Sequence, residues 1–230
     1  MRTKIFDSFT LKIIALLTMT IDHVGAVLLP QAEILRIIGR IAMPIYVFLL
    51  IQGFKHTSSR KRYLGGMLLF AVLSEVPYDF AHFGKCFDVQ SQNILFLFVI
   101  GIVMMMAMEW EKLYIDTLAP VIYPCVLAVT VLSMGALAYI IRADYSFYGI
   151  CMITAFYILD EYPVFAVCIA IVCTARMCGG IQNYSCLAYP FILFYSGERG
   201  NYLKSPLVKY MFYMFFPVHL WILYGLSLAI

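Results

Sequence analysis

The chain has 230 residues, of which 63% are hydrophobic and only 13% are charged. Soluble domains average about 45–50% apolar and about 25% charged residues, which excludes a fully soluble globular protein. A lipid bilayer accepts an apolar exterior, but backbone polar groups must then be paired within helices or a closed barrel. The long apolar runs favour helices. The net charge of +3 provides no basic field for nucleic acid, so the bilayer is the expected partner and nucleic acid is not.

A membrane-spanning helix needs roughly 17–25 mostly apolar residues. No long polar linker divides the chain, so residues 1–230 are expected to form a single domain. Asp22 and His23 interrupt the first apolar run and no small-residue cleavage site follows, so we expect this run to be retained as a span. The sequence predicts an all-α, polytopic membrane protein with about nine transmembrane helices, at residues 11–29, 34–54, 63–81, 93–110, 117–141, 145–160, 164–178, 184–196 and 206–228.

Positively charged residues in short loops remain on the cytoplasmic side of a membrane. The densest basic cluster follows the second predicted span and contains Lys55, Arg60, Lys61 and Arg62. Placing this loop in the cytoplasm also places the basic residues near the amino terminus there. The sequence therefore predicts a cytoplasmic amino terminus.

Many ionisable residues fall inside the predicted spans, where a charge costs about 3 kcal/mol at the centre of a helix on insertion scales. Such residues usually face a bundle interior or an aqueous cavity and mark function. With the predicted topology, polar side chains from six helices lie in one layer between the midplane and the outer surface. The sequence therefore predicts a polar intramembrane cavity, to which we assign His23, Arg40, Glu75, Asp79, Asn93, Asp144 and His219.

Two pairs of charged residues have helical spacing. Arg36 and Arg40 are four residues apart, as are Glu75 and Asp79, so each pair lies on one helix face. This spacing predicts that the arginines of the second span meet the carboxylates of the third. Such a pairing has a structural interpretation as well as a functional one, because buried ion pairs also hold helices together.

His23 is the leading candidate for acid–base chemistry, because an imidazole accepts a proton near neutral pH. Its neighbour Asp22 does not face it, since adjacent residues point in different directions on a helix. We therefore expect Asp22 to engage an arginine such as Arg40. The alternative for His23 is a hydrogen bond between helices. If His23 is the base, we expect one of three carboxylates, Glu75, Asp79 or Asp144, to orient its imidazole ring.

His219 follows Pro217 in the last predicted span. It fits a second acid or base, a ligand-binding group, or a packed histidine, and the sequence leaves these roles open. Tyr145 lies close to the predicted polar layer and is a possible hydrogen-bond donor. The HExxH, GxSxG and phosphate-loop motifs are absent, and the seven cysteines form no CxxC pair. We therefore expect no metal.

Six sequence blocks, in order and covering most of the chain, resemble the TraX family. The blocks that carry the resemblance are IALLTMTIDHVGAVLLP (Ile14–Pro30), LRIIGRIAMPIYVFLLIQGFKHT (Leu35–Thr57), LSEVPYDFA (Leu73–Ala81), ADYSFYGI (Ala143–Ile150), SGERG (Ser196–Gly200) and KYMFYMFFPVHLWILY (Lys209–Tyr224).

The resemblance implies an integral protein of a bacterial cytoplasmic membrane that transfers an acyl group from acetyl-CoA or another acyl-CoA. The founding activity of the family is N-terminal acetylation of a conjugative pilin subunit, and the family resembles a wider transmembrane acyltransferase superfamily. The acceptor would be an amino or hydroxyl group of a peptide, a sugar or a lipid-linked molecule. By this analogy His23 is the base or transient acyl carrier, and Arg40 lies near the acyl-CoA.

The remaining site predictions combine this resemblance with the charge pattern. We expect the catalytic group to be His23, Asp22, Glu75 and Asp79. We expect acyl-CoA to be bound by Arg40, Arg36, Lys55, Arg60, Lys61 and Arg62, and the acceptor by Asn93, Asp144, Tyr145 and His219. Intramembrane acids and histidines also build proton relays, so the alternative function is a proton-coupled small-molecule transporter. A membrane protein that binds a partner without chemistry is the third interpretation.

Overall fold

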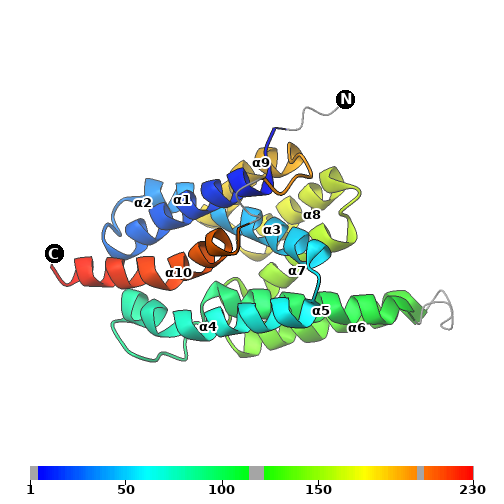
Figure 1. Ribbon diagram of the computed structural model, residues 1–230, viewed down its shortest axis with the longest axis horizontal. Coiled ribbons are helices and arrows are strands. Elements are labelled where there is room, and N and C mark those ends of the chain that lie inside the picture. The colour runs from blue at the N-terminus through cyan, green and yellow to red at the C-terminus, as the bar shows by residue number, and fades with distance from the viewer. Residues whose placement is uncertain (1–4, 114–121, 201–204, 230) are drawn as a thin grey trace.

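The computed structural model describes residues 5–113, 122–200 and 205–229. Within these ranges the regular structure is helical, which confirms the all-α prediction (Figure 1). The elements in chain order are α1 (Ser8–Val27), α2 (Glu33–Gly39), α3 (Ala42–His56), α4 (Arg60–Phe83), α5 (Ile94–Leu113), α6 (Ile122–Ile140), α7 (Ser146–Ile158), α8 (Pro163–Met177), the 3₁₀ helix η1 (Gly180–Ala188), α9 (Tyr189–Leu193) and α10 (Pro206–Ser227).

Fewer helices than predicted have the length of a membrane span. Among the described residues, the helices α7 and α8 are apolar but have only 13 and 15 residues. The prediction of about nine transmembrane helices is therefore not confirmed. Within the part of the chain that the structure describes, five stretches are long and apolar enough to cross a membrane, Ser8–Val27, Glu33–His56, Arg60–Phe83, Ile94–Leu113 and Ile122–Ile140.

The span predicted at 184–196 is wrong. These residues form the end of η1 and the five-residue helix α9. Pro190 stands in the first turn of α9, a position that proline favours because its missing backbone N–H would have no partner within the helix there. The first residues of the span predicted at 117–141 lie outside the described residues.

Local sequence signals set the ends of the helices that form the site. The Asp7 side chain accepts a hydrogen bond from the Thr10 backbone N–H and caps the start of α1. Ser59 caps α4 in the same way through the Arg62 N–H. Gly84 ends α4 with a φ of 66°, a left-handed conformation that glycine adopts without steric cost. These caps fix where the polar residues near each helix end are held.

The predicted second span is broken between α2 and α3, at Arg40 and Ile41. Pro44 lies in the first turn of α3, and a proline ring clashes with the carbonyl four residues earlier, here that of Arg40. Arg40 therefore lies in the turn between α2 and α3 rather than inside a continuous helix. The break carries its side chain into the bundle.

The helices pack so that one end of the bundle collects the polar residues. Helix α1 packs against α2, α3 and α10, helix α4 packs against α5 and α10, and α7 contacts α3, α5, α6 and α8. The α1–α2 turn, the α4–α5 connection and the α6–α7 turn lie at the same end, on the left of Figure 1. The opposite end carries the α3–α4 connection. The apolar core between the two ends includes Leu11, Ile51, Phe54, Leu97, Met104 and Ile153.

Candidate functional site

A cavity of about 150 Å³, hereafter the polar cavity, lies between the carboxyl-terminal halves of α1 and α4, the α2–α3 break and the α6–α7 turn. The predicted polar cavity is therefore present. Its apolar wall is formed by Met19, Ala42, Met43, Ile94 and Phe216. Its polar and charged lining is contributed by Asp22, His23, Arg36, Arg40, Tyr46, Tyr78, His82, Asp144 and Tyr145.

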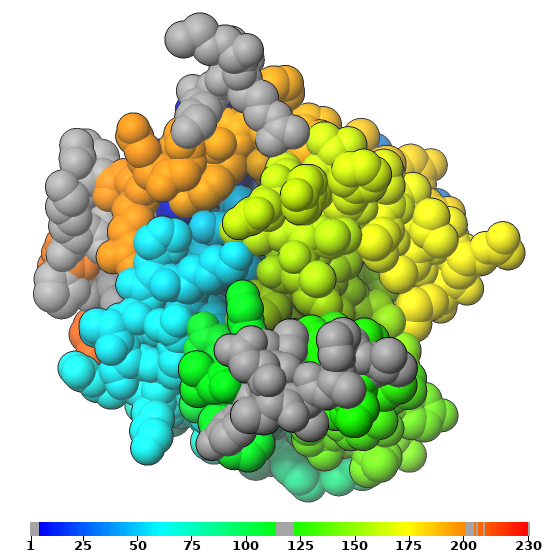
Figure 2. Space-filling view, turned by 90° about the vertical axis from the view of Figure 1, so that its right-hand side faces the viewer, coloured from blue at the N-terminus to red at the C-terminus, as the bar shows by residue number. Residues whose placement is uncertain are grey.

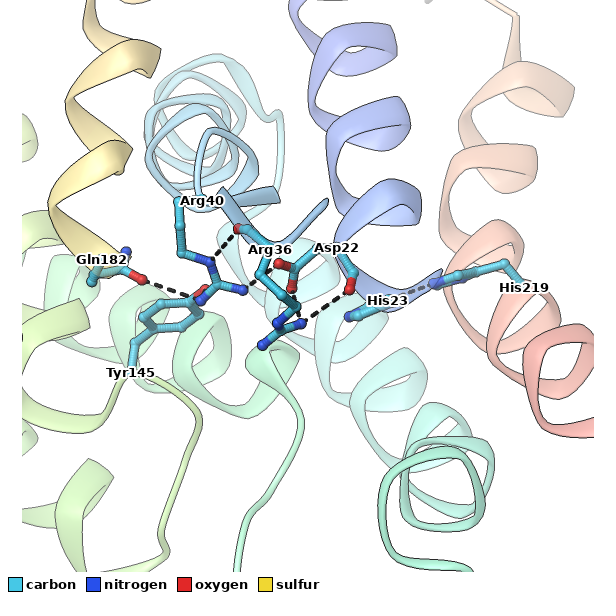
Figure 3. Close-up of polar contacts among 7 residues, drawn as sticks. All are labelled: Asp22, His23, Arg36, Arg40, Tyr145, Gln182 and His219. Carbon is cyan, nitrogen blue, oxygen red and sulfur yellow. Dashed lines mark hydrogen bonds and ion pairs between the residues drawn. The ribbon is translucent and has the colours of Figure 1, made fainter. Parts of the chain in front are cut away.

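Asp22 joins both arginines of the second predicted span (Figure 3). Its Oδ2 lies 2.8 Å from Nη1 of Arg36, and its Oδ1 lies 2.5 Å from Nη2 of Arg40. The expected engagement of Asp22 with Arg40 is thus confirmed. Gly39 makes this approach possible, because a Cβ at that position would overlap the Asp22 carboxylate. A buried carboxylate shared by two guanidinium groups is a charge-assisted network.

Arg40 is held on several sides. Its Nη1 donates to Tyr145 Oη and to Gln182 Oε1, each at 3.2 Å, and its Nε donates to the carbonyl of Arg36. With the bond to Asp22, four hydrogen bonds fix the guanidinium. Arg36 is more open, since about a third of its side chain is exposed. Arg40 is therefore a rigid positive charge in the cavity wall.

The predicted pairing of the arginines with Glu75 and Asp79 is wrong. Glu75 accepts hydrogen bonds from the backbone and the side chain of Asn93, and Asp79 accepts one from the Asp88 N–H. These bonds tie α4 to the α4–α5 connection. Helical spacing had put each charged pair on one face, but the face of α4 that carries the acids turns toward this connection, and none of the three residues Glu75, Asp79 and Asn93 lines the polar cavity.

His23 is oriented by His219 and not by a carboxylate. The Nδ1 of His23 lies 2.7 Å from Nε2 of His219, and the two rings are stacked (Figure 3). The Nδ1 of His219 lies 2.8 Å from the carbonyl oxygen of Phe215. A carbonyl only accepts, so His219 Nδ1 carries its proton and, when the ring is neutral, its Nε2 accepts from His23. The Nε2 of His23 then carries the lone pair of a base.

His82 is a second imidazole in the polar cavity, which the sequence analysis had not assigned to the site. Its Nδ1 donates to the Tyr78 carbonyl at 3.0 Å, so its Nε2 is also unprotonated when the ring is neutral. Its ring meets that of His23 edge to face, with centroids 5.6 Å apart. The predicted span ended at residue 81, whereas α4 extends to Phe83. His82 is the first residue after the predicted span, so an extension by one residue would have included it.

Asp144 and Tyr145 close the cavity from the α6–α7 turn. Asp144 Oδ1 accepts from the Tyr145 backbone N–H, and Tyr145 adopts a φ of 60° before the start of α7. Burial raises the pKa of Asp144 to about 6. Both residues, which the sequence analysis expected to bind the acceptor, line the polar cavity. Gln182 lies on η1 and accepts a hydrogen bond from Arg40. The sequence analysis did not assign it to the site, because it falls in the short connection between the spans predicted at 164–178 and 184–196.

A larger cavity of about 300 Å³, hereafter the apolar cavity, occupies the other half of the bundle. Its walls are mainly apolar and include Leu49, Leu50, Met67, Leu95 and Phe98. The two cavities share the lining residues Met19, Tyr46, Ile94 and Phe216. They therefore adjoin, and together they extend through the bundle along α1, α3 and α4.

The outer part of the apolar cavity is polar and basic, with Ser8, Lys12 and Arg199 in its wall. Figure 2 views the molecule from this end, where residues 194–200 (orange) lie beside the α3–α4 region (cyan). The guanidinium of Arg199 reaches the carbonyl of His56 at 2.8 Å, which joins the two segments. Lys12 and Arg199 come from distant parts of the chain, so no local motif indicated that they meet.

The predicted basic cluster is divided by the fold. Lys55 forms an ion pair of 2.6 Å with Asp160, and Arg60 forms one of 3.0 Å with Glu109. Lys61 and Arg62 are exposed on the first turn of α4. Two of the four residues of this basic cluster are therefore already paired with carboxylates, and none of the four lines the apolar cavity.

The fold and the site define an all-helical protein with several helices suited to a membrane and a charged, histidine-containing cavity inside its bundle. The chain belongs to the TraX family, since the family model described as TraX protein matches residues 8–227. It is 28% identical to the "Probable fimbrial assembly protein FimC, serogroup H1" of Dichelobacter nodosus, over 94% of this chain and 93% of that protein. It is 42% identical to an uncharacterized protein of Rickettsia prowazekii (strain Madrid E), over 26% of this chain and 24% of that protein. No solved structure matches.

Proposed function

We propose that this protein is an integral membrane acyltransferase that uses acetyl-CoA, or a related thioester, and transfers the acyl group to an acceptor at the opposite end of the bundle. The observation that carries this proposal is the adjoining pair of cavities, apolar at one end and charged at the other, with an oriented imidazole base in the charged half. The protein is proposed to act in a bacterial cytoplasmic membrane with the Lys12 and Arg199 end in the cytoplasm, because basic residues remain on that side.

The dimensions of the two cavities suit a long thioester donor. Ser8 lines the outer part of the apolar cavity and His23 lines the polar cavity. They are fifteen residues apart on α1, which corresponds to about 22 Å at the rise of an α-helix. Lys12 and Arg199 would bind the phosphates of the donor, while its extended arm occupies the apolar cavity. The thioester would then reach the polar cavity.

The polar cavity contains the groups that acyl transfer needs. The acceptor nucleophile attacks the thioester carbonyl, and His23 Nε2 removes its proton as the new bond forms. The bond from carbon to sulfur then breaks, and the proton passes from His23 to the thiolate of CoA. His219 accepts the Nδ1–H of His23 throughout and fixes the reactive tautomer. The guanidinium of Arg40 supplies a fixed positive charge near the developing oxyanion.

The apolar cavity offers a direct test. Leu49 is buried in its wall, so Leu49→Trp fills the proposed donor site, whereas Leu49→Ala enlarges it. Saturable binding of acetyl-CoA to the purified protein in nanodiscs should be lost in Leu49→Trp and kept in Leu49→Ala. Thermal unfolding of both variants checks that they fold. Equal acetyl-CoA affinity in folded Leu49→Trp and wild type would contradict the donor site. The described residues provide no observation that favours a proton-coupled transporter.

A further inference from the structure

The two cavities meet at a ring of side chains, hereafter the neck, formed by the residues that line both of them, Met19, Tyr46, Ile94 and Phe216. A thioester donor that enters from the basic end reaches the polar cavity by passing the neck. Three of these described residues have apolar side chains, so the phenolic hydroxyl of Tyr46 is the polar group among them. A hydroxyl at this place can contact the reacting end of the donor.

The hydroxyl of Tyr46 is available to a ligand. Of the three tyrosines that line the polar cavity, Tyr78 has its Oη 3.2 Å from Ser91 Oγ, and Tyr145 accepts a hydrogen bond from Arg40. Within the described residues, the Oη of Tyr46 has no hydrogen-bond partner. Its ring is nevertheless held in place, because it is partly buried and packs against both hydrophobic clusters of the bundle. A fixed donor without a protein partner is suited to bind an acceptor atom of a ligand.

Arg40 leaves a role for such a donor. A guanidinium has five N–H groups, and four of those of Arg40 are bonded to oxygen atoms of the protein. Arg40 therefore attracts negative charge but keeps only one N–H for a ligand. Stabilisation of an oxyanion depends on donors aimed at the oxygen atom on which charge develops. Tyr46 offers a directed donor from the neck, where the thioester enters the polar cavity.

We propose that Tyr46 binds the carbonyl oxygen of the acyl-CoA thioester and stabilises the oxyanion formed during transfer. This inference rests on the proposed acyltransferase function. As the nucleophile bonds to the carbonyl carbon, the carbon–oxygen double bond becomes a single bond and negative charge gathers on the oxygen. The Tyr46 hydroxyl keeps its proton and donates a stronger hydrogen bond to that oxygen. When the carbon–sulfur bond breaks, the double bond forms again, and the CoA thiolate takes the proton that His23 carries.

Ligand affinity tests the contact with the carbonyl oxygen. The probes are acetyl-CoA and S-ethyl-CoA, a thioether in which a CH₂ group replaces the carbonyl, measured with wild type and Tyr46→Phe in nanodiscs. Tyr46→Phe should bind acetyl-CoA about 2-fold to 10-fold more weakly than wild type, the range for one net hydrogen bond. It should bind S-ethyl-CoA as tightly as wild type does. An equal loss for both ligands, or no loss for either, would overturn the contact.

The rate of acetyl-CoA thioester loss tests the contact with the oxyanion. The kcat of Tyr46→Phe should fall roughly 100-fold, the loss expected when one oxyanion donor is removed. Its melting temperature should not fall, because the hydroxyl has no protein partner to lose. Tyr157→Phe is the matched control, since Tyr157 lies on α7 and lines neither cavity, and it should keep the kcat and affinity of wild type. An unchanged kcat in Tyr46→Phe, or a lower melting temperature, would contradict the inference.

The same measurements separate this inference from the proposed function. If wild type neither binds acetyl-CoA nor consumes its thioester, the acyltransferase function itself is refuted, and the role of Tyr46 with it. If wild type does both and Tyr46→Phe matches it in both, the acyltransferase function stands and only the role of Tyr46 is overturned.

Discussion

Replacing His219 with phenylalanine tests the orientation of the proposed base. Phenylalanine keeps the ring stacked on Phe215, now 5.0 Å away between centroids, but removes the acceptor that lies 2.7 Å from His23 Nδ1. A buried donor left without a partner costs about 1–3 kcal/mol. His23 avoids this cost by moving the proton to Nε2, which abolishes the base. Since each 1.36 kcal/mol is tenfold in rate, kcat should fall by about 5-fold to 150-fold.

The assay is the steady-state loss of the acetyl-CoA thioester in nanodiscs, with kcat and KM measured separately. KM for acetyl-CoA should be unchanged, because His219 lines neither cavity. His219→Gln should recover part of the rate, since its Oε1 can accept the Nδ1–H of His23. Full kcat in His219→Phe would refute the reasoning, as would a loss that appears only in KM.

Three further changes test the packing and charges around the site. Gly39→Ala should lower the melting temperature, with an overpacking cost of about 1–3 kcal/mol, because its Cβ overlaps Asp22; an unchanged melting temperature in detergent would count against the close approach. Burial raises the pKa of Asp144 from 3.8 to about 6, so the folded state keeps this proton to a higher pH than the unfolded state does. The free energy of unfolding therefore falls as the pH rises from about 4 to about 6, by up to about 3 kcal/mol. Asp144→Asn should therefore raise the melting temperature at pH 7.5, with a gain that shrinks toward pH 4; a gain independent of pH would contradict the titration. Asp7→Ala removes the cap of α1 and should cost about 1 kcal/mol in thermal unfolding, while no change would show that the cap is dispensable.

The long apolar helices were predictable because length and composition alone identify them. The ranges predicted at 11–29, 63–81 and 93–110 correspond to α1, α4 and α5. The break after α2 and the short helices near residue 185 were not predicted, because the apolar composition of a segment does not distinguish one continuous helix from two helices separated by a turn. Pro44 and Pro190 were the available signals.

The contents of the polar cavity were predicted better than its internal contacts. The predicted layer included His23, Arg40, Asp144 and His219, which the structure brings together around the cavity. Helical spacing determines which residues share a face, but it does not determine which neighbouring helix that face meets. For this reason Asp22, rather than Glu75 and Asp79, turned out to hold the arginines.

The relation of the apolar cavity to the basic end also lay beyond the sequence. Arg199 and Lys12 are separated by most of the chain, and only tertiary packing places both in one wall. The sequence analysis assigned acyl-CoA binding to the loop richest in basic residues, where the structure pairs Lys55 and Arg60 with carboxylates. A high local density of charge predicts topology more directly than it predicts a binding site.

The most direct test of the central claim is acetyl-CoA thioester loss catalysed by the purified protein in nanodiscs, compared between wild type, His23→Gln and Thr20→Ala. Thr20 lies on the same helix as His23, bonds through its hydroxyl to the Leu16 carbonyl, and lines neither cavity. The proposed mechanism predicts turnover in wild type and Thr20→Ala and its loss, by about 100-fold or more, in folded His23→Gln. Full turnover in His23→Gln would contradict the assignment of His23 as the base.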